Sequence, residues 1–346
     1  MRTHLTHRAV IAASALCAAL GARALAHQGH DEQGGTPSND RARGEHRPDA
    51  PPQGHVQKTM ERVALPEPSV SITIEGNARV IRANGLPGHE TGAFPNIENP
   101  NALRPQSHEY RVPLSPSIRD EPVSARPEFG IGLNGVIFDA GTGEFWTSGR
   151  DQVHRAGSDW NYEALGGGAP FGLDMNNAHV QPTGKYHYHG VPVGLLDELG
   201  GPSGSERMIQ IGWAFDGFPI YGQSGYDDAG DANSGVRALR SSYRLKEDER
   251  PARPDGPGGA YDGTFVNDWE YVAGLGDLDE CNGRFGVTPE FPEGTYYYVV
   301  TSEFPSVPRL WRGAPDESMR RRGPDGPPRG RLDGGGADRQ RGSRRE

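Results

Sequence analysis

The sequence predicts an all-β protein, built as a sandwich or barrel with long loops and little helix. Of the 346 residues, 50 are Gly and 30 are Pro, which together are about twice the usual share. Both residue types break helix interiors, and no helical period extends beyond two turns. Short β-branched or aromatic runs are bounded by Gly, Pro, Asn or Asp, as strands joined by tight turns are.

Five runs have the character of strands. Residues 70–74 and 186–189 alternate, which places every second side chain on the same face of a strand. The other three runs are β-branched or aromatic, at residues 136–138, 208–215 and 296–300. We expect one short helix near residues 161–165.

The N-terminus has the features of a cleavable signal peptide over residues 1–26. Arg2 and Arg8 bracket a basic start, residues 9–21 form a short apolar run, and Ala24-Leu25-Ala26 fits a cleavage site. Cleavage after Ala26 predicts a secreted or periplasmic protein whose first residue is His27. No apolar run reaches the length that a membrane-spanning helix needs.

Aromatic residues define the domain boundaries, because every Trp, Tyr and Phe lies between residues 67 and 312. Residues 27–66 and the Arg-, Gly- and Pro-rich residues 313–346 cannot bury enough apolar surface to fold, so both are expected to be disordered. Residues 67–312 are expected to form one β-rich domain. The net charge of −10 argues against a nucleic-acid partner.

The cysteine content excludes a disulfide within the mature chain. Cys17 lies in the signal peptide, which leaves Cys281 as the single cysteine. Its neighbours Asp279 and Glu280 would raise the pKa of the thiol, so a nucleophilic role is not favoured.

The strongest chemical signal is a cluster of histidines around residues 179–189. On a strand, His187 and His189 point the same way, roughly 7 Å apart, while Tyr186 and Tyr188 point to the opposite face. A turn before this strand can return His179 as a third nitrogen donor. Three histidines with an open position are a common zinc geometry, and imidazole also suits copper.

Three further residues are candidates near this cluster, each with a structural alternative. Asp174 could be a ligand, a catalytic carboxylate, or an acceptor that orients a histidine. Asp216 could act as a catalytic carboxylate, but Asp-Gly is also a common hairpin turn. His89 could be an additional ligand or a surface loop residue. The three clustered histidines could likewise be structural and bind no metal.

An internal similarity relates residues 173–189 to residues 278–298. Both segments contain the patterns L-D-x-x-N and P-x-G-x-Y-x-Y, with a spacing that is five residues longer in the second segment. The histidines are the residues that differ, because Arg284, Tyr297 and Val299 stand in their places. Either a duplication or chance similarity of two hairpins would produce this pattern.

The Tyr-His-Tyr-His run in this setting resembles the YHYH-domain proteins, a largely uncharacterised family of secreted, mainly bacterial proteins. The resemblance extends over about residues 70–312 and rests on five further blocks, at residues 84–89, 92–95, 133–136, 212–222 and 278–284. It implies export, a β-rich fold and clustered histidines. Carried onto this sequence, it favours a site at His179, His187 and His189, with Asp174, His89 and Asp216 near it.

Two functional hypotheses follow. In the first, the protein is secreted and binds a divalent transition metal, Zn or Cu, through the histidine cluster, which could support metal-dependent hydrolysis. In the second, it is a non-enzymatic extracellular binding or structural module with a metal-free histidine cluster. The partner would be a small molecule or an envelope or glycan component.

Overall fold

The computed structural model describes residues 64–125, 128–148, 158–201, 207–317 and 319. The expected signal peptide, most of residues 27–66 and nearly all of residues 313–346 lie outside the described residues. Within them the all-β prediction is confirmed, because strands dominate and the single α-helix is α1 (Val193–Glu198). No described helix has the length and apolar character that a bilayer crossing requires.

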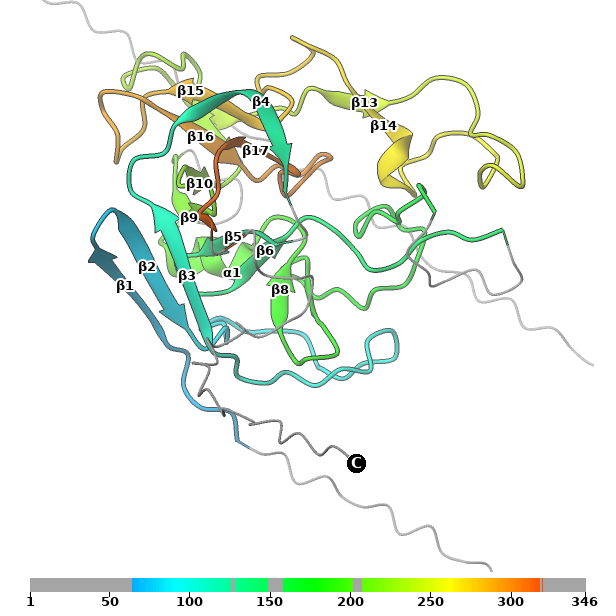
Figure 1. Cartoon of the computed structure of the whole chain (residues 1–346), viewed down its shortest axis with the longest axis horizontal. Coiled ribbons are helices and arrows are strands. Elements are labelled where there is room, and N and C mark those ends of the chain that lie inside the picture. Colours follow the sequence, from blue (N-terminus) through cyan, green and yellow to red (C-terminus); the bar gives the residue numbers. More distant parts are fainter. Residues whose placement is uncertain (1–63, 126–127, 149–157, 202–206, 318, 320–346) are drawn as a thin grey trace, which may run out of the picture. The chain divides into compact units, whose positions relative to one another are not determined.

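The largest element is an eight-stranded sheet (Figure 1). Its strands, in spatial order, are β15 (Gly283–Gly286), β16 (Thr295–Val299), β10 (Pro219–Tyr221), β9 (Gln210–Ala214), β5 (Glu128–Gly132), β6 (Ile137–Asp139), β8 (Tyr186–Tyr188) and β7 (Ala178–Val180). Two neighbouring pairs, β10 with β16 and β6 with β8, are parallel, and the other pairs are antiparallel. The strands do not close into a barrel among the described residues.

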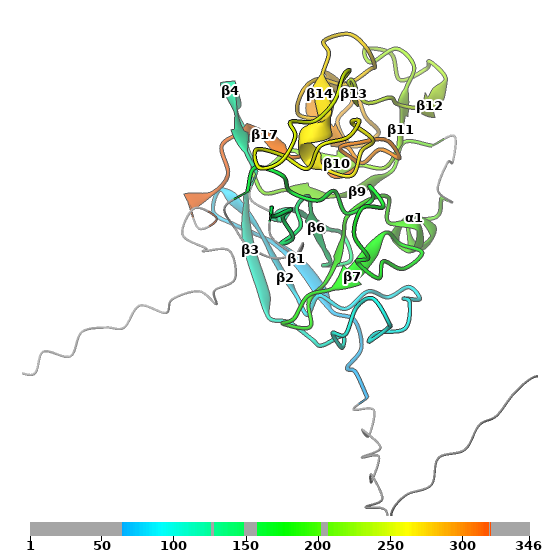
Figure 2. The same ribbon diagram turned by 90° about the vertical axis from the view of Figure 1, so that its right-hand side faces the viewer.

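Smaller sheets surround this one. A meander of three strands is formed by β1 (Val70–Glu75), β2 (Ala78–Ala83) and β3 (His108–Pro113), which lie side by side in Figure 1. Three two-stranded sheets pair β4 (Ile118–Ser124) with β17 (Leu310–Gly313), β11 (Ser224–Tyr226) with β12 (Val236–Ala238), and β13 (Tyr243–Leu245) with β14 (Trp269–Tyr271). In Figure 2 the last two pairs lie towards β9 and β10 and away from β7.

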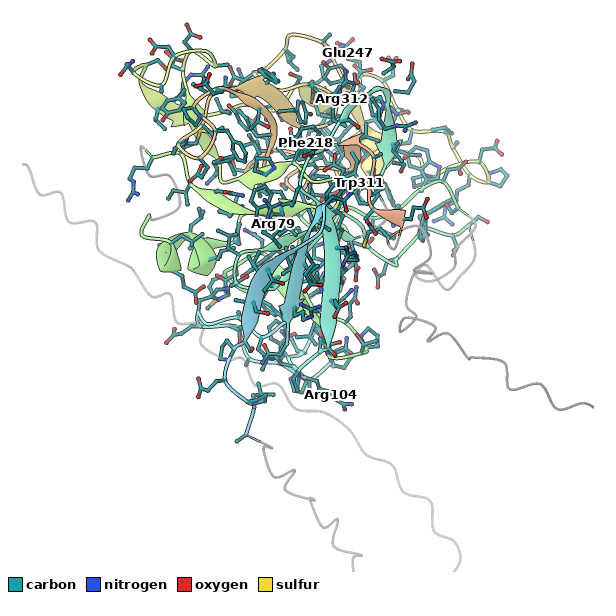
Figure 3. The ribbon with its side chains drawn as sticks, turned by 60° about the vertical axis from the view of Figure 1, so that its left-hand side comes forward. Arg79, Arg104, Phe218, Glu247, Trp311 and Arg312 are labelled. Carbon is teal, nitrogen blue, oxygen red and sulfur yellow. The ribbon has the colours of Figure 1, made fainter. Side chains whose placement is uncertain are left out.

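The core lies where the meander packs on the large sheet. The Tyr110 ring from β3 stacks on the Phe215 ring at a centroid distance of 4.5 Å, and both side chains are buried. The Arg79 guanidinium from β2 lies 3.4 Å from the centre of the Trp213 ring in β9 (Figure 3). Aromatic stacking and cation–π contacts therefore join the two sheets at the same seam.

The sequence located the strands better than the helix. Each of the five expected strands overlaps an observed one, namely β1, β6, β8, β9 and β16. The helix expected at residues 161–165 is wrong, because Asn161 and Tyr162 form isolated β-bridges with Phe145 and Phe265. The side-chain amide of Asn161 also donates to the backbone carbonyls of Thr142 and Glu144, which holds this segment extended.

Gly135 closes the turn between β5 and β6 in a conformation that other residues adopt at a cost. Its φ is +83°, and an added Cβ would lie 2.4 Å from the Cβ of Ala83. We expect Gly135→Ala to lower the free energy of unfolding by about 3 kcal/mol, from backbone strain and overpacking together. Urea unfolding measures this change.

Gly76→Ala is the matched control for this substitution. Gly76 has a φ of +66°, but nothing lies within 4 Å of its added Cβ. Only the backbone strain remains, so the expected loss is about 1 kcal/mol. Equal losses for the two variants would contradict the packing described around Gly135.

Candidate metal centre

The β7–β8 hairpin brings the three clustered histidines together. His179 in β7 lies directly opposite His187 in β8, and His189 follows one residue after the end of β8. The Nε2 atom of His189 lies 2.9 Å from Nε2 of His187 and 3.2 Å from Nε2 of His179. The three residues form a group that could hold a metal ion, with candidate ligand atoms within 4.8 Å of one another.

The turn that precedes β7 fixes the position of this hairpin. The Asp174 carboxylate accepts hydrogen bonds from the backbone N–H groups of Asn176 and Ala178. Asn177 adopts the left-handed conformation with φ of 51°, which Asn tolerates better than most residues. The Asn177 carbonyl then accepts the backbone N–H of His189 at 2.7 Å, so the turn holds the third histidine beside the strand pair.

Backbone carbonyls set the orientation of each ring. The Nδ1 atom of His179 lies 2.7 Å from the carbonyl oxygen of Phe171, and Nδ1 of His187 lies 3.3 Å from that of Lys185. Burial lowers the pKa of His189, and a hydrogen bond with the backbone of Asp139 opposes this effect, as a carbonyl acceptor does. A carbonyl can only accept, so Nδ1 carries the proton in His179 and His187, and their Nε2 atoms offer lone pairs.

The converging lone pairs fit a metal ion. In a tetrahedral site with Zn–N bonds of about 2.05 Å, neighbouring ligand nitrogens lie about 3.3 Å apart. The observed Nε2 separations of 2.9 and 3.2 Å are close to this value. Hydrogen bonding of the opposite ring nitrogen to a carbonyl is also the usual environment of a metal-binding histidine.

Burial keeps the imidazoles neutral. The exposed fractions of His187 and His189 are 1% and 4%, whereas His179 is half-buried and forms the accessible side of the cluster. Burial lowers the pKa of all three histidines, for His187 and His189 well below the usual value. The neighbouring imidazoles and the Lys185 ammonium add to this effect on His187. Neutral imidazole is the form that binds a metal.

Charged groups that are buried or half-buried lie near enough to the histidines to affect their protonation. Lys185 pairs with Glu128 at 2.5 Å, and Arg309 pairs with Glu163. Burial raises the pKa of the Asp139 carboxyl to about 6, and the amide of Gln181 donates to this carboxyl at 3.3 Å. Lys185 and Arg309 both disfavour protonation of His189.

The structure places Asp174 and His89 on the other face of β8. Asp174 accepts hydrogen bonds from the Tyr186 hydroxyl at 2.7 Å and from the backbone N–H of Gly92 at 3.0 Å. The Nε2 atom of His89 lies 2.6 Å from the Tyr188 hydroxyl, and its Nδ1 lies 2.9 Å from the carbonyl oxygen of Glu90. Both residues therefore contact tyrosines that point away from the three clustered histidines.

Asp216 lies in the turn between β9 and β10 and is fully buried. Its carboxylate accepts hydrogen bonds from the Tyr298 hydroxyl at 2.5 Å and from the backbone N–H of Gly313 at 2.8 Å. Burial raises the pKa of this carboxyl to about 6. These contacts give Asp216 a role in joining β10, β16 and β17.

Cys281 is free and fully buried. Burial raises the pKa of its thiol, and the carboxylates of Asp279 and Glu280 raise it further. A thiol in this environment is a poor nucleophile.

The sequence did not identify the residues that orient the rings. Phe171 and Asp139 act through backbone carbonyls, which leave no signature in residue type. Glu128 lies 57 positions before its partner Lys185, so no local pattern connects them. One available signal was Asp139 itself, a carboxylate that directly follows the apolar run Val136-Ile137-Phe138.

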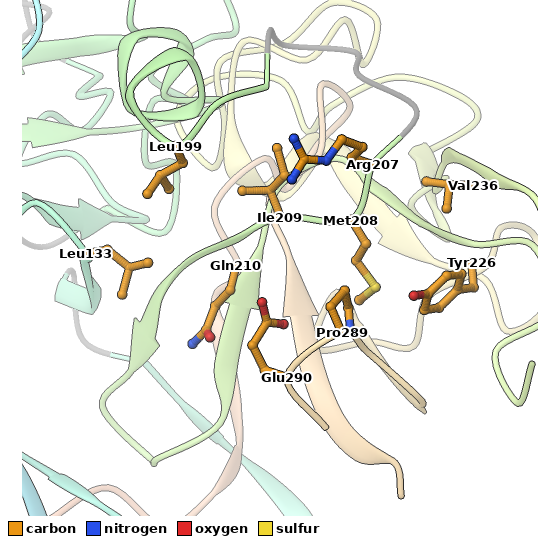
Figure 4. A pocket seen from close by; sticks show the side chains of 10 residues that line it. All are labelled: Leu133, Leu199, Arg207, Met208, Ile209, Gln210, Tyr226, Val236, Pro289 and Glu290. Carbon is orange, nitrogen blue, oxygen red and sulfur yellow. The ribbon is translucent and has the colours of Figure 1, made fainter. Parts of the chain in front are cut away.

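One cavity among the described residues lies away from the histidines. It has a volume of about 490 Å³, and Figure 4 shows its lining by Leu133, Leu199, Arg207, Met208, Ile209, Gln210, Tyr226, Val236, Pro289 and Glu290. No histidine of the cluster belongs to this lining. This cavity is therefore separate from the candidate metal centre.

The protein is thus an all-β protein in which three imidazoles converge at a candidate metal centre. The comparison with family models gives a match to the family described as "YHYH protein" over residues 109–313, which is more than half of the chain. The chain belongs to the YHYH family. Searches for similar curated proteins and for similar solved structures found no match.

The metal-free protein should lose stability as pH falls below about 6.5, the pKa of histidine in an unfolded chain. The folded pKa values of His179, His187 and His189 are lowered, so the unfolded state takes up protons first. The free energy of unfolding should fall by up to about 1.4 kcal/mol per pH unit for each histidine, until the folded pKa is reached. Urea unfolding between pH 7.5 and 5, with a chelator present, measures this slope.

The triple variant H179A/H187A/H189A is the control for this prediction. It keeps the Asp139 carboxyl, whose raised pKa makes the opposite contribution by stabilising the fold as pH falls through about 6. Its free energy of unfolding should therefore depend less steeply on pH than that of the wild type. Identical slopes would argue against buried, neutral histidines.

Proposed function

We propose that this YHYH-family protein is exported and holds one divalent transition metal ion, Zn²⁺ or Cu²⁺, at His179, His187 and His189. One observation carries the proposal: the three Nε2 atoms converge, while backbone carbonyls accept from the Nδ1 atoms of His179 and His187. Neutral ring nitrogens that converge in this way favour a cation between them.

The chemistry of the donors selects the metal class. Imidazole suits zinc and copper, whereas calcium and magnesium prefer oxygen ligands. Because the imidazoles are neutral in the folded state, metal binding does not have to displace protons at neutral pH. Lys185 pairs with Glu128, and Arg309 pairs with Glu163. Because these carboxylates are already paired, the histidine nitrogens are the candidate metal ligands.

Metal-dependent hydrolysis is the second candidate function. It is favoured by the half-buried side of the cluster at His179, where three protein ligands would leave a coordination position open. A bound ion would supply an activated water and Lewis acidity. Asp174 and Asp216 are the candidate catalytic carboxylates, but Asp174 accepts from Tyr186 on the opposite face of β8, and Asp216 accepts from Tyr298 and Gly313 at the β9–β10 turn. Binding without catalysis is therefore the primary proposal.

The untagged wild-type protein should contain one equivalent of Zn or Cu by elemental analysis after reconstitution. His187→Ala should weaken metal binding more than about 100-fold, since loss of an outer hydrogen-bond partner alone weakens it 10- to 100-fold. Competition with a chromogenic chelator measures the affinity. The same samples, assayed with ester and phosphate substrates, separate hydrolysis from binding.

His89→Gln is the matched control, because this histidine contacts Tyr188 on the opposite face of β8. This variant should bind the metal as tightly as the wild type. The proposal fails if the reconstituted wild type holds no stoichiometric transition metal. A loss in His89→Gln as large as that in His187→Ala would also count against the assigned ligands.

Export rests on the sequence of residues 1–26, which resembles a secretory signal peptide. The full chain produced in a Gram-negative host should be recovered from the periplasm or the medium, with a mature N-terminus at His27. Mass spectrometry of the intact protein and its N-terminal peptide measures this start. A cytoplasmic product that still begins at Met1 would contradict export.

A further inference from the structure

The two halves of the large sheet have the same arrangement of strands when each half is read from the centre of the sheet outwards. From the centre outwards, β5, β6, β8 and β7 on one side correspond to β9, β10, β16 and β15 on the other. Each side begins with an antiparallel hairpin, continues with a strand parallel to the second hairpin strand, and ends with an antiparallel edge strand. This symmetry of direction and order relates two four-stranded halves.

The residue pairing at the centre obeys the same symmetry. Ile131 in β5 pairs with Trp213 in β9, and the flanking pairs are Gly130 with Ala214 and Gly132 with Gly212. Every antiparallel ladder has such a local axis, but here the offset of 82 (213 − 131) also relates the pairs of the two inner hairpins, since Ile131↔Ile137 corresponds to Trp213↔Pro219. A local two-fold axis therefore passes between Ile131 and Trp213.

The inner hairpins share their irregularities. The register of β5 with β6 shifts between Glu128 and Gly130, and the register of β10 with β9 shifts at the corresponding step, between Ile220 and Tyr221. A bulge at a matching position is a specific feature, because it interrupts the ladder at one residue.

The turns of the inner hairpins also match. They contain Asn134-Gly135 and Asp216-Gly217, with glycine φ values of +83° and +105°. The Asn134 amide donates to the Tyr188 hydroxyl in one half, and the Tyr298 hydroxyl donates to Asp216 in the other half. Each turn is thus joined to the tyrosine at the same place in the adjoining strand.

The outer hairpins match in register and in hydrogen bonds. His179 pairs with His187 as Arg284 pairs with Tyr297, and the next pair matches in both hairpins. Asn177 and Asn282 have φ values of 51° and 55°, and each accepts a backbone N–H, from His189 and Val299 respectively. Asp174 binds the Tyr186 hydroxyl as Asp279 binds that of Tyr296.

We infer that β5 to β8 and the set β9, β10, β15 and β16 are two copies of one four-stranded unit, the second with β11 to β14 inserted in it. We infer also that the second copy retains the counterpart of the histidine cluster, with Arg284 as its cation. The repeat visible in sequence covers only the outer hairpins, whereas the symmetry covers all eight strands. The part of this inference that concerns a cation in the first copy rests on the proposed function.

The counterpart site shows how the second copy differs. Arg284 donates from Nε to the Tyr297 hydroxyl at 2.6 Å and from its guanidinium to the carbonyl of Tyr226. Tyr297 and Val299, which correspond to His187 and His189, are fully buried. A covalently attached positive charge thus lies on the hairpin strand where His179 stands in the first copy.

The comparison also separates shared residues from residues that belong to the histidine centre. Aligned by the same pairings, Glu128, Asp139 and Lys185 of the first copy correspond to Gln210, Tyr221 and Thr295 of the second. The charged side chains of Glu128, Asp139 and Lys185 therefore occur in the first copy only, which is the copy that carries the histidines.

The test transplants the second copy's side chains into the first. The variant H179R/H187Y/H189V should fold, because arginine and tyrosine form a hydrogen-bonded pair in this frame. The truncated variant H179A/H187A/H189A loses packing at the same sites. Without metal, the transplanted variant should unfold at a temperature at least about 4 °C higher than the truncated variant. A midpoint equal to or below that of the truncated variant overturns the inference.

A second comparison covers the case in which the truncated variant does not fold. His179→Arg alone introduces the cation opposite His187 without the tyrosine hydroxyl, so it should unfold at a lower temperature than the transplanted variant. The reverse order overturns the inference. All of these measurements use metal-free protein, whereas the metal content of the wild type tests the proposed function separately.

Discussion

The close pairing of β5 with β9 is the constraint on which the rest of the sheet depends. It joins two halves at strands that are glycine-rich, and an added Cβ on Gly130 or Gly212 would lie 2.6 or 2.5 Å from a backbone oxygen of the partner strand. Only glycine fits at such a distance. Between these glycines Ile131 pairs with Trp213, and Arg79 packs on the ring of Trp213. Some of the chain's many glycines therefore lie where two backbones approach closely.

The histidine centre follows from the frame that this pairing supports. His187 lies in β8, which runs parallel to β6, and His179 lies in its antiparallel partner β7. His189 directly follows β8. The carbonyls of Phe171, Lys185 and Asp139 orient the rings, so the nitrogens converge without any contribution from a carboxylate ligand. The second half of the sheet shows that the frame is stable with other side chains at these positions, since Arg284 and Tyr297 fill it.

Much of this arrangement could be predicted from local sequence, because a strand repeats every two residues. That period places His187 and His189 together and directs Tyr186 and Tyr188 to the other face, as observed. Sequence could not show that His89 contacts one of those tyrosines, 99 positions away, or that Asp174 binds the other. The expected helix at residues 161–165 failed for the same reason, because β-bridges with residues far along the chain determine its conformation.

The distribution of contacts along the chain has a consequence for folding. The three histidines lie within residues 179–189, so closing the hairpin that brings them together costs little loop entropy. In contrast, β5 must find β9, and β10 must find β16, across segments of about eighty residues, and such non-local pairings slow folding. The histidine cluster therefore depends on a local contact, whereas the centre of the sheet depends on contacts between distant segments. A metal ion bound to the hairpin, as proposed, would stabilise the paired edge strands β7 and β8 during folding, before the distant strands β5 and β9 have paired.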